Sequence, residues 1–132
     1  MGDAIYFGNA STDSRDYRGW FVGQFIASDD LRCNQDVEVK WGVHPAGDER
    51  EWGVNRAATS LGLLIVGRFR YTFPDREVVL REQGDYVIWA AGTPHRWLAE
   101  IDSSILTVRW PSVVDDGITV SDEQALSIEQ SS

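Results

Sequence analysis

Residues 84–95 read GDYVIWAAGTPH, and this stretch decides the fold. It begins with Gly84 and Asp85, a pair that favours a tight turn with a positive φ angle at the glycine. The run that follows, residues 86–89, is apolar and aromatic, as expected for a short strand. A second strand is predicted at residues 95–101, after another glycine. The stretch therefore indicates short strands separated by glycine-containing turns.

Residues 36–44 form the clearest strand, because apolar and polar residues alternate along them. We expect one face of this strand to belong to the core and the other to be polar. The expected core face holds Val37, Val39, Trp41 and Val43, and the polar face holds Glu38, Lys40, Gly42 and His44.

Residues 61–73 are apolar before Gly67 and alternate after it, which predicts a bend at this glycine. Further strands are expected at residues 78–80 and 105–110, with Gly, Pro, Asp and Ser turn signals between the runs. No long helical period occurs. This all-β pattern is typical of a sandwich or a barrel.

The composition predicts one compact domain. The 132 residues are 42% hydrophobic, which is enough for one core and too little for two ordinary domains. We assign the core domain to residues 20–112. Residues 1–19 are expected to form an arm that docks partly on this body. Residues 113–132 form an acidic tail, with a short helix expected within residues 122–128.

The net charge of −9 comes from 12 basic and 21 acidic residues. It opposes binding to nucleic-acid phosphates and to anionic lipid headgroups, so neither is predicted as a partner. The single cysteine, Cys33, forms no internal disulfide. The sequence contains no apolar run long enough to span a bilayer and no signal-peptide pattern, so we expect a cytoplasmic protein.

The spacing within residues 84–95 resembles the second cupin motif, in which a glycine, five residues, a proline, one residue, a glycine, two residues and a histidine follow one another. Only the proline differs, since Ala90 stands in its place. Gly47 and Gly67 fit the two ends of the first cupin motif. The resemblance implies a cupin double-stranded β-helix, an RmlC-like jelly-roll barrel.

Three segments, residues 36–44, 84–89 and 106–112, look like those of small uncharacterised bacterial cupins that are sometimes labelled signal peptidase I. Bacterial signal peptidases use a serine and a lysine and carry a membrane anchor. This sequence has a single lysine, Lys40, and no anchor pattern, so it does not support that label.

In cupins the barrel holds iron, manganese, zinc or nickel on three histidines and one carboxylate, and His95 matches the last of these ligands. The other three ligand positions read Gly53, Asn55 and Ser60. A divalent ion needs several imidazole or carboxylate ligands. No metal cofactor is therefore predicted.

An alternative registration of the first motif places His44 five residues before Glu49. Together with His95, these residues make a set of two histidines and one carboxylate, which suits iron or zinc with open positions. This registration leaves Gly67 eighteen residues after the glutamate, whereas the motif requires seven.

The resulting hypothesis is a small-molecule-binding protein of unknown ligand that lacks the usual cupin metal. Its expected pocket residues are His95, Trp97, Asn55 and Ser60. The first two lie two residues apart and so share one face of a strand. No catalytic residue is assigned.

Three alternatives stay open. The first is a metal-dependent oxygenase or isomerase built on His44, Glu49 and His95. The second is a metal-free epimerase or isomerase with His95 as the base and Tyr71 or Tyr86 as the acid. The third is a structural or regulatory module in which His95 is a buried, hydrogen-bonded residue without a ligand.

A homodimer is expected for two reasons. Residues 20–26, WFVGQFI, are rich in aromatic side chains that this short segment cannot bury by itself. A cupin sandwich also exposes strand edges. Among the remaining residues, Trp41 and Trp110 are expected in the core, and Arg68 and Arg70 on a solvated face paired with acidic residues.

Overall fold

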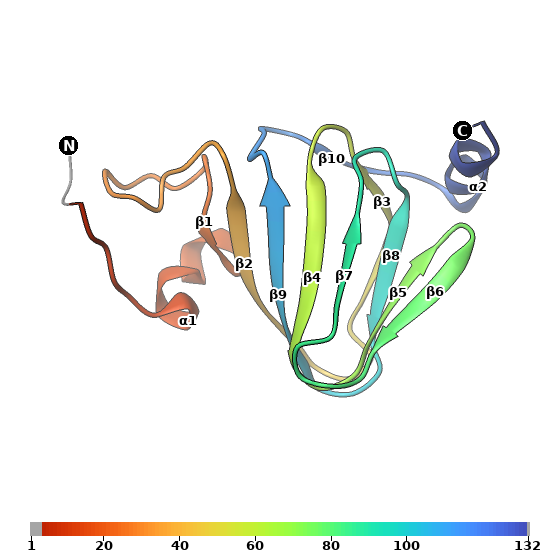
Figure 1. Ribbon diagram of the computed structural model, residues 1–132, viewed down its shortest axis with the longest axis horizontal. Helices are drawn as coiled ribbons and strands as arrows, with labels where there is room; N and C mark the ends of the chain where they lie inside the picture. Colours follow the sequence, from red (N-terminus) through yellow and green to blue (C-terminus); the bar gives the residue numbers. More distant parts are fainter. Residues whose placement is uncertain (1–3, 132) are drawn as a thin grey trace.

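The computed structural model describes residues 4–131. Two five-stranded antiparallel sheets face each other and enclose the core (Figure 1). The first sheet has the order β1 (Trp20–Val22), β2 (Glu38–His44), β9 (Ser103–Trp110), β4 (Thr59–Val66) and β7 (Tyr86–Trp89). The second has the order β10 (Gly117–Thr119), β3 (Glu49–Asn55), β8 (His95–Ala99), β5 (Phe69–Phe73) and β6 (Arg76–Leu80). The predicted all-β class is confirmed.

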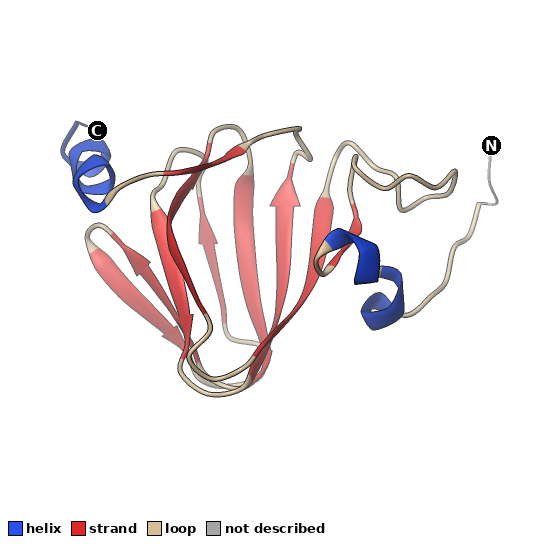
Figure 2. Ribbon diagram, turned by 180° about the vertical axis from the view of Figure 1, so that it is seen from behind, coloured by secondary structure: helices blue, strands red, loops and turns tan. Residues whose placement is uncertain are grey.

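Helices are few among the described residues. The arm contains α1 (Ala10–Asp13) and a 3-10 turn (Arg15–Tyr17), and the tail contains α2 (Asp122–Ser131) (Figure 2). The helix predicted within residues 122–128 is therefore confirmed. None of the described helices is long and apolar enough to cross a membrane.

The barrel has one end closed by loops. The loops after β2, β4, β6 and β8 gather at the lower end in Figure 1. There the backbone N–H of Gly84 donates to the carbonyl oxygen of Leu64 at 2.9 Å. Gly67 and Gly84 have φ angles of +112° and +92°, which confirms the predicted bend and tight turn. Residues 111–116 connect β9 to β10 and so pass from the first sheet to the second at the opposite end.

The core lies between the sheets and is rich in aromatic side chains. Phe69, Tyr71 and Phe73 alternate along β5 with less buried neighbours, as the period of two predicts. On the outer side, Arg68 and Arg70 form ion pairs with Glu100, which agrees with the expected ion-paired face. The core cluster comprises Leu64, Phe69, Tyr71, Phe73, Leu80, Trp89, Ala99 and Ile105.

The orientation predicted for β2 is wrong, because its polar face points into the barrel. Glu38 and His44 are only 7% and 8% exposed, whereas Val43 is 66% exposed. Glu38 pairs with Arg109 of β9, and both belong to the inner face. An alternating pattern predicts two unlike faces, and the apolar one is inside only when the interior is apolar. Here the interior is polar near β2.

The outer face of the first sheet is consequently apolar and carries no charged residue. The register places side chains of β2, β9, β4 and β7 next to one another on this side. Tyr86 and Ile88 of β7 are 61% and 50% exposed. Together with Val43, they expose a broad hydrophobic surface. Its members are Val39, Trp41, Val43, Leu61, Leu63, Ile65, Tyr86, Ile88, Leu106 and Val108.

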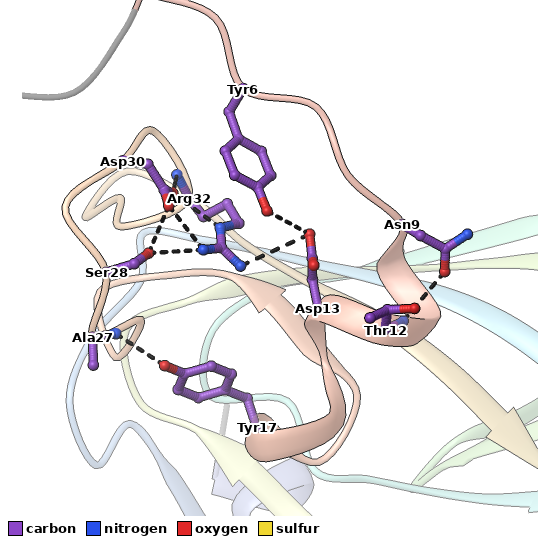
Figure 3. Close-up of polar contacts among 9 residues, drawn as sticks. All are labelled: Tyr6, Asn9, Thr12, Asp13, Tyr17, Ala27, Ser28, Asp30 and Arg32. Carbon is purple, nitrogen blue, oxygen red and sulfur yellow. Dashed lines mark hydrogen bonds and ion pairs between the residues drawn. The ribbon is translucent and has the colours of Figure 1, made fainter.

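Figure 3 shows how the N-terminal arm is attached to the body. Asp13 of α1 accepts a hydrogen bond from the Tyr6 hydroxyl at 2.8 Å and forms an ion pair with Arg32 at 3.8 Å. The Tyr17 hydroxyl accepts from the backbone N–H of Ala27 at 3.1 Å. The arm therefore docks on the loop that follows β1, as expected.

Three strands were not predicted from the sequence. They are β1, β3 and β10, and the first and last of these have only three residues each. The sequence of β3, EREWGVN, begins with three exposed charged residues and does not alternate cleanly. The placement of Trp110 in the core is also wrong, because its side chain is 39% exposed at the end of β9.

Candidate functional site

The candidate site is the space between the two sheets. Side chains from both inner faces surround a cavity of about 30 Å³, which has room for roughly one water molecule. Its wall is formed by Lys40, His44, Arg50, Phe69, Tyr71, Trp89, His95, Trp97, Ile105, Thr107 and Arg109.

A larger pocket of about 350 Å³ lies beside it. The two spaces are neighbours, because Arg109 lines both of them. The larger pocket has an aromatic wall formed by Tyr17 of the arm, Trp20 of β1 and Phe25 of the loop that follows β1. Four carboxylates line it as well, those of Asp16, Glu38, Asp115 and Asp116. Asn55 at the end of β3 also lines this outer pocket.

His95 begins β8 and is 2% exposed. Its Nδ1 atom lies 3.0 Å from the carbonyl oxygen of Thr93. Since a carbonyl only accepts, Nδ1 carries the proton and Nε2 keeps its lone pair. Burial lowers the pKa of His95 to about 4, and the charges of Arg50 and Arg109 act in the same direction. His95 is therefore a neutral hydrogen-bond acceptor at neutral pH.

Three buried polar atoms on the first sheet have no hydrogen-bond partner in the structure. They are Nε of Arg109, Oγ of Ser60 and Nε1 of Trp89. The register pairs Ser60 with Arg109 on one side and with Trp89 on the other, so the three side chains form a row across the inner face. The Trp89 ring lies 4.8 Å from the ring of His95, measured between centroids. This row of unpartnered donors faces the second sheet.

Three cationic side chains line the same cavity. Lys40 comes from β2, Arg50 from β3 and Arg109 from β9. Nη1 of Arg109 lies 3.5 Å from a carboxylate oxygen of Glu38, whose other oxygen accepts from the Ser112 hydroxyl at 2.8 Å. Burial lowers the pKa of Lys40, and the charges of Arg109 and Arg50 lower it further.

The sequence was compared with known proteins. No family model and no curated protein matches it. Solved structures do match. KdgF from Halomonas sp. is 19% identical, with a TM-score of 0.57 over 62% of this chain and 74% of that one. An uncharacterised protein with a double-stranded β-helix domain from Klebsiella pneumoniae is 17% identical, with a TM-score of 0.59 over 67% and 78%.

A cupin superfamily protein from Desulfitobacterium hafniense is 19% identical, with a TM-score of 0.53 over 64% of this chain and 71% of that one. The chain has the cupin fold. Identities this low establish the fold alone. The chemistry of the site has to be argued from the side chains of this chain's own barrel. The resemblance inferred from residues 84–95 is thereby confirmed at the level of the fold.

The residues at the ligand positions of a cupin metal site do not fit a divalent ion. Gly53 has no side chain, Asn55 offers an amide, Ser60 offers a hydroxyl, and only His95 supplies an imidazole. The nearest atom to a Cβ built on Gly53 is Nη2 of Arg50, at 3.3 Å. A guanidinium cation thus lies where the first ligand would project, and it would repel a metal cation.

The alternative metal set is not brought together. Glu49 pairs with Leu98 on β8 and points to the outer surface. His44 does line the cavity, but its Nδ1 atom lies 2.7 Å from a carboxylate oxygen of Asp48. Among the side chains that the structure describes, those of residues 4–126, there is no cluster of three or more His, Cys, Asp or Glu placed to hold a metal.

The two tyrosines proposed as acids are in different places. Tyr71 lines the cavity together with His95, whereas Tyr86 is exposed on the outer face. The Trp89 ring lies between the two cavity residues, with centroids 5.2 Å from Tyr71 and 4.8 Å from His95. Burial raises the pKa of Tyr71.

The four predicted pocket residues are thus placed as follows. His95 and Trp97 line the inner cavity from one face of β8, as their spacing predicts. Ser60 lies fully buried behind it, and Asn55 lines the outer pocket. Sequence reasoning missed the cations, Trp89 and Tyr17. The signal for Lys40 was the alternation of its strand, whose polar face was assigned to the wrong side. No face was assigned to the strand that holds Arg109.

Proposed function

We propose that this cupin-fold protein binds a small polar molecule in its barrel without a transition metal. The observation that carries the proposal is the row formed by Arg109, Ser60 and Trp89, whose buried polar atoms lack partners. A buried donor without an acceptor costs about 1–3 kcal/mol. A ligand with acceptor atoms would satisfy several of these donors at once.

The second sheet supports the same proposal. Opposite the row, His95 presents an unprotonated Nε2 atom, and Trp97 offers an aromatic wall. Ligand pockets combine apolar walls with a few placed polar groups, which is the composition found here. The donor set at Gly53, Asn55 and Ser60 argues against a metal as the occupant.

A metal-free isomerase is the second candidate, because His95 and Tyr71 share the cavity. In that reaction Nε2 of His95 would accept a proton and the Tyr71 hydroxyl would supply one. The low pKa of His95, about 4, makes it a weak base at neutral pH. Binding is therefore the function that the geometry supports better.

A thermal-shift panel of neutral sugars, nucleosides and small acids tests the proposal, with Trp89→Phe as the key variant, because Trp89 lines the cavity, and Ser60→Ala as the control, because Ser60 lies behind it. Without ligand, Ser60→Ala should melt at the wild-type temperature or higher, since it removes an unpartnered buried hydroxyl. With a compound that stabilises the wild type, Trp89→Phe should show a smaller shift and Ser60→Ala the wild-type shift. A panel in which no compound shifts the wild type contradicts the proposal, as does a wild-type shift in Trp89→Phe.

A further inference from the structure

We propose that the group held inside the barrel is an oxyanion, a carboxylate or a phosphate of a small organic molecule, and that Lys40, Arg50 and Arg109 bind it. This inference rests on the proposed function and adds the charge of the ligand. Nothing in the cupin fold itself requires such a cluster of cations.

The three cations converge from separate strands of both sheets. Lys40 and Arg109 lie on β2 and β9, which are adjacent strands of the first sheet. Arg50 lies on β3 of the second sheet, in register with Trp97, which faces the cavity. All three line one small cavity, so a ligand there contacts both sheets.

The charges of the three cations are balanced only in part, since Asp48 acts electrostatically on Lys40, and Glu38 and Asp116 act on Arg109. Glu38 is the carboxylate that pairs with Arg109. In the part of the chain that the structure describes, no carboxylate forms an ion pair with Lys40 or Arg50. Lys40 and Arg109 are half-buried while Arg50 is exposed, and like charges that lie close together repel one another. A ligand carrying negative charge would reduce that repulsion.

The sign of this cluster is opposite to that of the whole chain. The protein has a net charge of −9, and the half-buried arginines outside this cluster have acidic partners, such as Asp30 for Arg32 and Glu100 for Arg70. A cation-lined cavity in an acidic protein concentrates anions at one place.

The unpartnered donors point to the same chemistry. Nε of Arg109, Oγ of Ser60 and Nε1 of Trp89 all have hydrogen atoms to donate. An oxyanion accepts several hydrogen bonds, and those from charged donors are the strongest. A neutral hydroxyl ligand would leave part of the row unsatisfied.

The inner cavity and the outer pocket differ in volume, which assigns the charged group and the rest of the ligand to different spaces. The inner cavity of about 30 Å³ has room for about one oxygen atom of the oxyanion, and the rest of that group lies toward the outer pocket. The outer pocket of about 350 Å³ has room for an organic body against Tyr17, Trp20 and Phe25. It is also lined by Asp16, Glu38, Asp115 and Asp116, so the body that it takes is uncharged. Arg109 lines both spaces, so it lies at their boundary, where the charged group and the organic body of the ligand would meet. An aromatic acid or an aromatic phosphate ester fits this division.

Isothermal titration calorimetry at fixed ionic strength tests the inference with benzoate, phenyl phosphate and the neutral analogue benzamide. We expect benzoate or phenyl phosphate to bind at least about tenfold more tightly than benzamide. Acetate and inorganic phosphate, which lack the aromatic body, should bind more weakly than their aromatic counterparts. The stronger of the two aromatic anions identifies the carboxylate or the phosphate as the natural group.

Arg50→Gln and Lys40→Gln should each weaken binding of the preferred anion by roughly tenfold or more. Arg96→Gln is the matched control, since Arg96 is exposed and faces outward from β8 beside Trp52. It makes the same change in net charge and should leave the affinity unchanged. Arg109 is avoided because its ion pair with Glu38 also has a structural role.

Three results would overturn the inference. If benzamide binds as tightly as the anions and Arg50→Gln has no effect, the ligand is uncharged, and the proposed function survives. If none of the anions binds at about 10 mM while neutral compounds of the panel still stabilise the protein, the charge assignment alone is wrong. If neither the anions nor the panel compounds bind, both proposals fail.

Discussion

The Nη2 atom of Arg50 lies 3.3 Å from the position that a Cβ atom on Gly53 would take. In a metal-binding cupin a histidine projects from the position of Gly53 into the barrel. Here the glycine leaves that space free, and the guanidinium of a neighbouring residue approaches it. The same geometry that removes a metal ligand therefore supplies a cation, and the site changes from one that attracts metal ions to one that attracts anions.

The first prediction concerns metal content. Protein purified without a histidine tag should carry well below one equivalent of iron, manganese, zinc or nickel, measured by inductively coupled plasma mass spectrometry. The reason is that Gly53, Asn55 and Ser60 supply no imidazole or carboxylate. About one equivalent in the wild type that is lost in His95→Ala would contradict this.

The second prediction concerns packing between the sheets. A Cβ atom on Gly62 of β4 would overlap the Tyr71 hydroxyl and lie 2.7 Å from its Cζ atom. Tyr71 is 2% exposed and has little room to move. Gly62→Ala should therefore lower the free energy of unfolding by about 1–3 kcal/mol, measured by urea denaturation.

The control for this prediction is Gly117→Ala, because the nearest atom to a Cβ there is 3.7 Å away, an ordinary contact. This variant should be close to the wild type in stability. Adding Tyr71→Phe to Gly62→Ala should recover part of the loss, since the overlapping oxygen is removed. A Gly62→Ala variant as stable as the wild type would show that the close approach is wrong.

The third prediction concerns pH. Burial lowers the pKa of His95 to about 4 from its usual 6.5, so the unfolded chain binds more protons than the folded chain between these values. The contribution of His95 to stability is complete above about pH 6.5 and is lost as the pH falls toward 4. The loss amounts to about 3 kcal/mol. His44, whose pKa is also lowered by burial, adds a change in the same direction.

Urea denaturation at several pH values between about 7 and 4.5 measures this slope. His95→Asn keeps a donor for the Thr93 carbonyl oxygen but does not titrate, so its stability should depend less on pH. His44→Asn serves as the comparison, since it removes the other histidine. An unchanged slope in His95→Asn would mean that His95 is not the buried neutral group described here.

The fourth prediction is a homodimer through the outer face of the first sheet. This face presents apolar side chains from four strands and covers roughly 400 Å², if strands lie about 4.8 Å apart and residues rise about 3.3 Å each. That is as large as the largest apolar patches of ordinary monomers. We propose a second copy as its partner, because two chains of net charge −9 can approach most closely through a face without carboxylates.

Light scattering should return twice the 14.8 kDa mass of one chain at micromolar concentration. Ile88→Glu should return the monomer mass, since Ile88 is half exposed on this face and a buried carboxylate would oppose association. Val114→Glu is the control, because Val114 is 65% exposed and lies outside the sheet. A monomeric wild type would contradict the proposal, and a dimeric Ile88→Glu variant would place the interface elsewhere.

The sequence predicted the fold well because its turns need particular residues. Gly67 and Gly84 adopt positive φ angles, and the alternation after Gly67 correctly placed Phe69, Tyr71 and Phe73 inside. The alternation of apolar and polar residues gave the wrong orientation where the barrel interior is polar, because alternation alone does not say which face of a strand is enclosed. Glu38, Lys40 and His44 were misplaced in this way, although their strand was correct.

The candidate site was predictable only in part. His95 and Trp97 follow from a motif and a period of two, and both line the cavity. Arg50 was not predicted as a cavity residue because its strand shows no clean alternation. The register between this strand and β8 shifts between Arg50 and Gly53. Such an irregularity depends on the neighbouring strand and leaves no mark in the local sequence.

The most direct test of the account is the indole N–H resonance of Trp89 in ¹H–¹⁵N NMR spectra. The chain has six tryptophans, and Trp89 is the one whose Nε1 atom is buried without a partner in the structure. Titration with benzoate or phenyl phosphate should move the Trp89 indole resonance to saturation, because this N–H gains an acceptor, whereas exposed Trp110 should stay in place. A Trp89 resonance that does not move, while either compound still binds, would contradict a ligand site inside the barrel.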